Sequence, residues 1–315
     1  MPGETIRVGV VGHGHFGAYH AKQYAAHPDA HLVAVADPDT SAANAVAAAY
    51  GNIHVSHYRD LIGRVDAVSI AVPTGLHEAV AAEFIDAGVH VLIEKPLCGT
   101  AGAARRVSER AKRAGVILHV GHIERYSAVY GQLKTELQSP PLLIEAHRHA
   151  PWLGRILDVD VVLDMMIHDI DLVLDLMGSL PVAVEASGVA MMGYGLDVVL
   201  ARIGFASGAM AQISASRIAP NVSRVMRAAE AARTLTVDFS AGTLGVFNAA
   251  SNKTTDHAVP PRDALRAEID AFLGAVAGID DVGVGGPDAV RALALGDRIR
   301  SSALGETQSS TVTPT

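Results

Sequence analysis

The stretch that decides the fold runs from Ile6 to Gly17 and reads Ile-Arg-Val-Gly-Val-Val-Gly-His-Gly-His-Phe-Gly. Its apolar first half predicts a strand, and its end opens a predicted helix. The glycines follow the pattern Gly-x-Gly-x-x-Gly, in which Gly12 permits a tight turn, Gly14 admits a pyrophosphate and Gly17 lets helix and strand pack closely. The helix N-terminus would offer N–H donors to the phosphates. The stretch therefore predicts a dinucleotide-binding unit.

A carboxylate stands where such a unit needs one. Asp37 lies twenty positions beyond Gly17 (37 − 17), at the end of the second predicted strand, where it can bind an adenosine ribose diol. Asp39 follows, and no Lys or Arg occurs before Arg59, so a 2′-phosphate would meet two carboxylates and no cation. We therefore expect NAD rather than NADP. The alternative to dinucleotide binding is that the loop is a glycine-rich turn without a ligand. The cofactor residues assigned here are Gly12, Gly14, His15, Phe16, Gly17 and Asp37.

The first 122 residues alternate between apolar runs and helix-like segments. After the first unit, strands are predicted over 32–36, 67–71, 89–93 and 116–120, and helices over 41–50, 76–87 and 101–114. Such alternation predicts a parallel sheet covered on both faces. The fold class is therefore α/β, with an N-terminal Rossmann dinucleotide-binding domain over residues 1–122.

The pattern changes after residue 122. Helices are predicted over 124–137, 160–177, 264–277 and 287–302, and strands over 142–148 and then repeatedly from 182 to 247. This predicts a second α/β domain, residues 123–315, with a large, mostly antiparallel open sheet. Residues 305–315 are expected to form a mobile tail.

Composition excludes several classes of protein. Of the 315 residues, 50% are hydrophobic and 18% charged, which excludes general disorder. The formal net charge of −8 argues against a surface built for nucleic acid or anionic lipid. Cys98, the single cysteine, excludes an intrachain disulfide and a multi-cysteine metal site. The most apolar late stretch, 159–177, carries six ionisable side chains, so we expect a cytoplasmic protein with no membrane segment.

Two further loops follow strands at the edge where ligands bind in such sheets. The residues assigned to the cofactor there are Pro73, Thr74, His77, Glu94 and Lys95. A lysine after an apolar strand is usually a solvated side chain. Lys95 differs because it stands between Glu94 and Pro96, where a nicotinamide would lie.

A third element is the segment Asp164-Met-Met-Ile-His168-Asp-Ile-Asp171. Asp164 and His168 are four residues apart and share one helical face. A carboxylate beside an imidazole suits it to accept a proton from a hydroxyl. The alternative is a polar helix face toward water. No third ligand follows at regular spacing, so no metal is expected.

Together these residues resemble the Gfo/Idh/MocA family of oxidoreductases, and the Glu94-Lys95-Pro96 element is the most specific signal. The resemblance covers nearly the whole chain, and no catalytic position of the family is replaced. It implies a Rossmann domain followed by an α/β domain, residues 123–315, that binds substrate and whose open sheet mediates oligomerisation. It also implies that Lys95, Asp164 and His168 are catalytic.

Residues 120–126 and 155–171 resemble more closely the members that oxidise C3 of UDP-N-acetylglucosamine for lipid A biosynthesis. A cluster of basic residues at the site would suit a diphosphate, although a solvated basic face is the alternative. The substrate residues assigned are Lys95, Arg125, Tyr126, Arg148, Arg155, Asp164 and His168.

The expected function is NAD-dependent oxidation of a sugar ring hydroxyl, with a UDP-sugar as substrate and a homodimer or homotetramer as the assembly. His168 would remove the hydroxyl proton, Asp164 would orient the imidazole and Lys95 would bind the same oxygen, although Lys95 could itself be the base. The alternatives are a dehydrogenase of a free sugar or inositol, and a non-catalytic NAD-binding regulator.

Overall fold

The computed structural model describes residues 5–51, 53–152, 154 and 159–306, which divide into two units. The first unit consists of residues up to Ser127 together with Arg262–Val290, and the second of Ala128–Pro261 together with the chain from Arg291 onward. The first division falls five residues after the boundary expected at residue 122 (127 − 122). Neither unit is continuous in sequence, because a late segment belongs with the N-terminal one. Of the expected tail, only Gly305 and Glu306 lie within the described residues.

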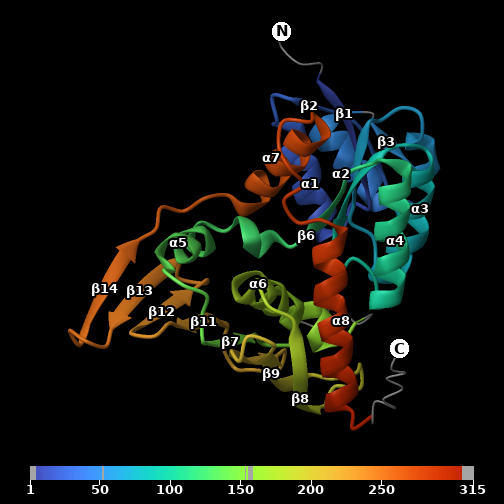
Figure 1. Cartoon of the computed structure of the whole chain (residues 1–315). Helices are drawn as coiled ribbons and strands as arrows, with labels where there is room; N and C mark the ends of the chain where they lie inside the picture. The colour runs from blue at the N-terminus through green and yellow to red at the C-terminus, as the bar shows by residue number, and fades with distance from the viewer. Residues whose placement is uncertain (1–4, 52, 153, 155–158, 307–315) are drawn as a thin grey trace. The chain divides into compact units, whose positions relative to one another are not determined.

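The first unit contains a six-stranded parallel sheet in the order β3-β2-β1-β4-β5-β6. Figure 1 labels β1, β2, β3 and β6 of this sheet. Its strands are β1 (Ile6–Val11), β2 (Ala30–Ala36), β3 (His54–Val55), β4 (Ala67–Ile70), β5 (His90–Glu94) and β6 (Leu118–Gly121). Its helices are α1 (His15–Ala25), α2 (Thr40–Tyr50), α3 (His77–Asp86), α4 (Ala101–Ala114) and α7 (Ala264–Val276), with 3₁₀ turns η1 (Tyr58–Leu61), η2 (Thr74–Leu76) and η3 (Ile123–Tyr126). The Rossmann sheet predicted from the alternation is confirmed.

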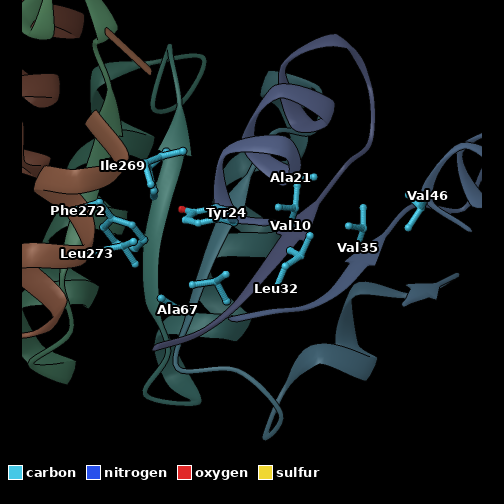
Figure 2. Close-up of a cluster of buried hydrophobic side chains, with 12 residues drawn as sticks. Val10, Ala21, Tyr24, Leu32, Val35, Val46, Ala67, Ile269, Phe272 and Leu273 are labelled. Carbon is cyan, nitrogen blue, oxygen red and sulfur yellow. The ribbon is translucent and has the colours of Figure 1, made fainter. Parts of the chain in front are cut away.

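The core of this unit forms where β1 lies between β2 and β4. Val8 and Val10 of β1 are wholly buried, and α1 adds Tyr24. The late helix α7 completes the core with Ile269, Phe272 and Leu273 (Figure 2). Burying a side chain such as Phe272 stabilises the fold by about 1.5–3 kcal/mol, which explains why α7 belongs with the Rossmann sheet.

The second unit contains an eight-stranded sheet in the order β14-β13-β12-β11-β7-β10-β9-β8. Its strands are β7 (Leu143–His149), β8 (Pro181–Val189), β9 (Val198–Phe205), β10 (Met210–Ser216), β11 (Ser223–Ala229), β12 (Arg233–Asp238), β13 (Thr243–Asn248) and β14 (Lys253–Ala258). Among the strands that the structure describes in this sheet, only β7 and β10 pair parallel, so the mostly antiparallel sheet is confirmed. The strand β9 alternates buried and solvent-accessible residues, as expected of a sheet with one covered face.

Two predicted helices differ from the structure. The helix expected over 124–137 is broken at Ser127, so that η3 precedes the shorter α5 (Ala128–Glu136). The helix expected over 160–177 begins with a π turn, η4 (Val162–Met166), and continues as α6 (Ile167–Met177). α8 (Gly286–Ala303) spans the division between the units. The hydrophobic periodicity predicted these helices, but it could not show where the α-helix gives way to a 3₁₀ or a π turn.

Candidate active site

The glycine loop has the geometry that its sequence predicts. Gly12 has a φ of +88°, and a Cβ there would lie 2.6 Å from the Ala71 carbonyl oxygen. A Cβ at Gly17 would collide with the Gly12 carbonyl oxygen, whereas a Cβ at Gly14 would meet nothing within 4 Å. Gly12 and Gly17 are therefore required by the fold. Gly14 leaves its surroundings open to a ligand.

The N-terminus of α1 is arranged to receive an anion. Gly14 is its N-cap, makes no side-chain capping bond, and no acidic residue occupies the first turn. The N–H donors of that turn are therefore available to a phosphate. The exposed ring of His15 lies edge-on to Phe16 and Tyr19, with ring centroids 5.4 and 5.0 Å apart. The residues present fit the pyrophosphate of a dinucleotide.

The ribose-binding candidate Asp37 is held by the loops beside it. Its Oδ2 accepts the His13 N–H at 2.6 Å, and its Oδ1 accepts the Asp39 N–H at 2.8 Å. Asp39 in turn caps α2 by accepting the Ser41 N–H at 2.8 Å, and this hydrogen bond lowers the pKa of Asp39. The two carboxylates that would oppose a 2′-phosphate are therefore fixed by backbone donors, and both are solvent-accessible.

His77 links the loop after β4 to the loop after β5. Its ring is only 1% exposed, and its nitrogens lie 3.0 Å from the Pro96 carbonyl oxygen and 2.9 Å from the Val72 carbonyl oxygen. Pro73 and Thr74 between these anchors are solvent-accessible. His77 therefore holds the two loops together, whereas Pro73 and Thr74 are accessible just beyond the end of β4.

In the Glu94-Lys95-Pro96 element, the Glu94 side chain makes internal contacts and the Lys95 side chain is partly exposed. Glu94 turns inward, where its Oε1 lies 3.0 Å from His20 Nε2 and its Oε2 accepts the Lys95 N–H at 3.2 Å. Lys95 is half-buried, and the peptide bond to Pro96 is cis. Glu94 therefore supports the backbone from which Lys95 extends.

The substrate candidates Arg125 and Tyr126 lie in η3, directly after β6, and both are half-buried. The Tyr126 hydroxyl lies 2.9 Å from Nε2 of the buried His119. Burial, assisted by the nearby His122, lowers the pKa of His119 to about 3. His119 is therefore neutral at physiological pH and holds the Tyr126 ring in place.

In the second unit, Asp164 lies within the π turn and His168 lies in the first turn of α6. These two and Met165 are half-buried in a stretch whose other members, from Val159 to Val173, are buried. A π turn inserts an extra residue into a helix and is frequent at functional sites. The structure presents Asp164 and His168 on the accessible side of this segment, as a proton-transfer pair requires.

Two buried carboxylates fix the start of this helical segment. Asp160 Oδ1 accepts the N–H groups of Val162 and Leu163 at 3.1 and 3.2 Å, and its Oδ2 accepts Arg300 Nε–H at 2.7 Å. Asp169 forms a two-fold ion pair with Arg148, at 3.1 and 3.0 Å. Arg148, assigned from the sequence to substrate, is only 3% exposed. A ligand could take this guanidinium only by breaking a buried pair.

The sequence did not indicate the buried ion pair between Arg217 and Asp197. Arg217 forms a buried pair with Asp197 at 2.7 Å and donates to the carbonyl oxygens of Val159 and Tyr194 at 3.0 and 2.9 Å. Its guanidinium also lies 5.0 Å from the centroid of the Trp152 ring. These contacts hold Val159 just before the helical segment and place the Arg217 guanidinium beside Trp152. No local sequence pattern identifies a pair twenty residues apart (217 − 197).

Three negative observations complete the site. Arg155, assigned to substrate from the sequence, lies outside the described residues. Within the described ranges, no group of three or more His, Cys, Asp or Glu side chains could hold a metal ion. No helix among the residues placed by the structure is long and apolar enough to cross a membrane.

Two family models match the chain. Residues 6–122 match the oxidoreductase family with an NAD-binding Rossmann fold, and residues 120–245 match the Gfo/Idh/MocA C-terminal domain. These matches cover the glycine loop, the Glu94-Lys95-Pro96 element and the Asp164/His168 pair.

Curated proteins and solved structures give a consistent result. The chain is 37% identical over 303 residues to UDP-N-acetylglucosamine 3-dehydrogenase of Acidithiobacillus ferrooxidans, covering 94% of this chain and 96% of that protein. A solved structure of that enzyme superimposes with a TM-score of 0.90, covering 96% and 98% of the two chains at 36% identity. Inositol 2-dehydrogenase of Rhizobium meliloti is 27% identical over 93% of this chain and 95% of its own length.

Proposed function

The chain belongs to the Gfo/Idh/MocA family of NAD-binding oxidoreductases, and from this we propose that it oxidises the C3 hydroxyl of UDP-N-acetylglucosamine to the 3-oxo sugar. The observation that carries the proposal is the 37% identity to an enzyme of that name over nearly the whole of both chains. Inositol 2-dehydrogenase of Rhizobium meliloti, over a comparable length, is 27% identical. Lipid A biosynthesis is the pathway that this product would serve. NAD and nucleotide sugars are both cytoplasmic metabolites, so we propose a cytoplasmic enzyme.

Bound NAD would supply the acceptor for the hydride of the carbinol carbon. Gly14 and the first turn of α1 would hold its pyrophosphate, and Asp37 its adenosine ribose. The proposed nicotinamide contacts come from the strand-end residues Pro73, Thr74 and Lys95. These roles rest on side chains and backbone donors that the first unit presents at the ends of its parallel strands.

Three side chains of this protein would handle the substrate hydroxyl. His168 would take the proton from the C3 oxygen, and Asp164, one turn earlier, would orient the imidazole. Lys95 would donate a hydrogen bond to the same oxygen and stabilise the negative charge that develops there. Arg125 and Arg155 would supply positive charge to the diphosphate.

Turnover assays separate the three candidate functions. We expect NADH to form with UDP-N-acetylglucosamine and not with free N-acetylglucosamine or myo-inositol at equal concentrations. Turnover of a free polyol alone would replace the proposed substrate with that class. NAD binding without turnover of any sugar would favour the non-catalytic regulator.

A change at Asp37 should alter the choice of dinucleotide. In the native protein a 2′-phosphate would lie against Asp37 and Asp39, a like-charge contact that costs roughly a few kcal/mol when partly desolvated. Asp37→Ala should therefore weaken NAD binding and reduce the ratio of the NADP to the NAD dissociation constant. Titration calorimetry with both cofactors measures the ratio. Asp29→Ala, a change of the same charge elsewhere in the first unit, is the control and should leave the ratio as in the native protein.

We propose that a second copy of the chain covers the open face of the eight-stranded sheet, giving a homodimer or homotetramer. Exposed Arg227 and Glu145 pair in register on β11 and β7, and Arg202 lies two strands beyond. Apolar Leu200 and Met210 are also exposed there. Alternating charges with apolar neighbours suit a self-complementary contact. Sedimentation equilibrium at micromolar concentration measures the assembly, and a monomer would contradict the proposal.

A further inference from the structure

An exposed aromatic side chain lies in the loop that joins β8 to β9. Residues 190–195 of this loop are all exposed, and Met191 and Tyr194 keep 65% and 48% of their surface in contact with solvent. The Tyr194 ring stacks on the half-buried ring of Trp152, with centroids 6.0 Å apart and an angle of 15° between the planes. Exposed apolar side chains that gather at one place indicate a binding surface, whereas scattered ones do not.

The stacked rings are held in place by a buried ion pair. The Arg217 guanidinium lies 5.0 Å from the Trp152 ring centroid, and its Nη2 donates to the Tyr194 carbonyl oxygen at 2.9 Å. Its partner Asp197 accepts Arg217 Nε–H on one oxygen at 2.7 Å and the Met191 N–H on the other at 2.5 Å. Both charged side chains are buried. The loop and its ring pair are therefore fixed before a ligand arrives, which lowers the entropic cost of binding.

The same loop is bound directly to the helical segment that carries the candidate proton-transfer pair. The Leu196 carbonyl oxygen accepts the Val161 N–H at 2.9 Å. A Cβ at Gly195 would lie 3.1 Å from the Asp160 Cβ, so the loop packs against Asp160. The Asp160 carbonyl oxygen accepts the Asp164 N–H at 2.9 Å. A continuous series of contacts within the second unit therefore joins the exposed ring to the site of reaction.

The separation between the ring and His168 suits an elongated ligand. His168 lies eight residues beyond Asp160 (168 − 160), which is about 12 Å along a helix, and Tyr194 directly precedes the residue that packs against Asp160. A ligand that reaches from His168 to the Tyr194 ring must therefore be longer than a single sugar. In a nucleotide sugar, the ribose and the diphosphate separate the base from the sugar by a span of this order. A flat base can stack on an aromatic ring whatever hydrogen bonds it makes.

We propose that the exposed ring of Tyr194, supported by Trp152 and Arg217, stacks against the base of the nucleotide-linked sugar and so selects nucleotide sugars over free sugars. The proposal rests on the proposed function, because it takes the reacting sugar to lie at His168 and assigns the other end of the same substrate to Tyr194. A contact remote from the reacting carbon acts equally on the bound substrate and on the transition state. Its loss therefore raises KM much more than it lowers kcat.

Binding of UDP to the full chain tests the proposal without turnover. Trp152 is the only tryptophan in the sequence, so with NAD present UDP should change the tryptophan emission saturably. Tyr194→Leu should raise the UDP dissociation constant, measured by titration calorimetry, by about 5- to 100-fold, the usual contribution of one base stacked on one aromatic ring. Tyr194→Phe keeps the ring and should stay within about two-fold of native. Phe247→Leu, which replaces an exposed aromatic side chain on β13 of the same unit, is the matched control and should bind UDP as the native protein does.

Four outcomes decide between the proposal and the proposed function. If KM for UDP-N-acetylglucosamine rises in Tyr194→Leu in parallel with the UDP dissociation constant, both are supported. If the sugar is oxidised but Tyr194→Leu binds UDP as the native protein does, the base lies elsewhere and only the proposal is overturned. If UDP binding depends on Tyr194 but no sugar is oxidised, the proposed function fails and the base-stacking role stands. If Tyr194→Leu keeps native UDP affinity and has a smaller assembly mass in sedimentation, the ring belongs to a contact between copies and the proposal is wrong.

Discussion

Replacing His168 by asparagine is expected to lower kcat by about 10²–10⁴-fold, the usual contribution of a general base. Asparagine keeps the polarity and much of the volume of the side chain but cannot accept the substrate proton. The cofactor contacts proposed above all belong to the first unit, so the NAD dissociation constant should remain near native. Steady-state kinetics with the preferred sugar, together with NAD titration, measures both quantities.

Two further variants test whether the loss of activity is specific to His168. Asp164→Asn should lower kcat less than His168→Asn, because it misorients the imidazole without removing it. His257→Asn, on β14 of the same unit, removes an imidazole that contacts Glu136 and should leave kcat unchanged. The pH profile of His168→Asn should also lack one limb of the native profile. A kcat within ten-fold of native would exclude His168 as the base.

The parts of the fold that sequence could predict are those set by local chemistry. The glycine loop was predictable because each glycine answers a separate local need, a positive φ at Gly12, open space at Gly14 and close packing at Gly17. The same holds for the helix 101–114, whose N-cap Thr100 and C-terminal Gly115 are strong signals, and whose bounds match the prediction.

The parts that sequence could not predict depend on partners distant along the chain. The periodicity of residues 264–277 predicts a helix but cannot show that α7 packs on the Rossmann sheet, about 240 residues from Tyr24 (264 − 24). Arg148 was assigned to substrate because basic residues near a site suit a diphosphate, and its buried partner Asp169 could not be foreseen. The break at Ser127 and the π turn at Asp164 change winding without changing hydrophobic period.

The same distinction applies to the candidate site. Residues that present side chains to a ligand follow strand ends and are found by motif, as with Asp37 and Lys95. Residues that hold them in place, such as His20 and Asp160, are buried polar groups whose partners lie on other elements. Only coordinates reveal these supports, because their requirement is a mutual hydrogen bond in a dry interior.

Replacing Lys95 by methionine should reduce both kcat and sugar affinity. The proposed ammonium contact is to the reacting oxygen, so it acts on the bound substrate and more strongly on the developing oxyanion. Losing one such donor lowers kcat by about 10²–10³-fold, and KM for the sugar should rise as well. Methionine preserves the length of the side chain, so the backbone contact to Glu94 should persist. Lys112→Met, an exposed lysine in the last turn of α4, is the matched control and should behave as native.

Comparison of the Lys95 and His168 variants decides which residue is the base. If His168 is the base, Lys95→Arg should recover part of the activity of Lys95→Met, because an arginine can still donate a hydrogen bond to the oxygen although its geometry differs. If Lys95 is the base, Lys95→Arg should be as inactive as Lys95→Met, because arginine does not give up its proton at neutral pH. In that case His168→Asn would retain substantial turnover. The roles assigned above would then be exchanged, with the oxygen held by His168 and deprotonated by Lys95.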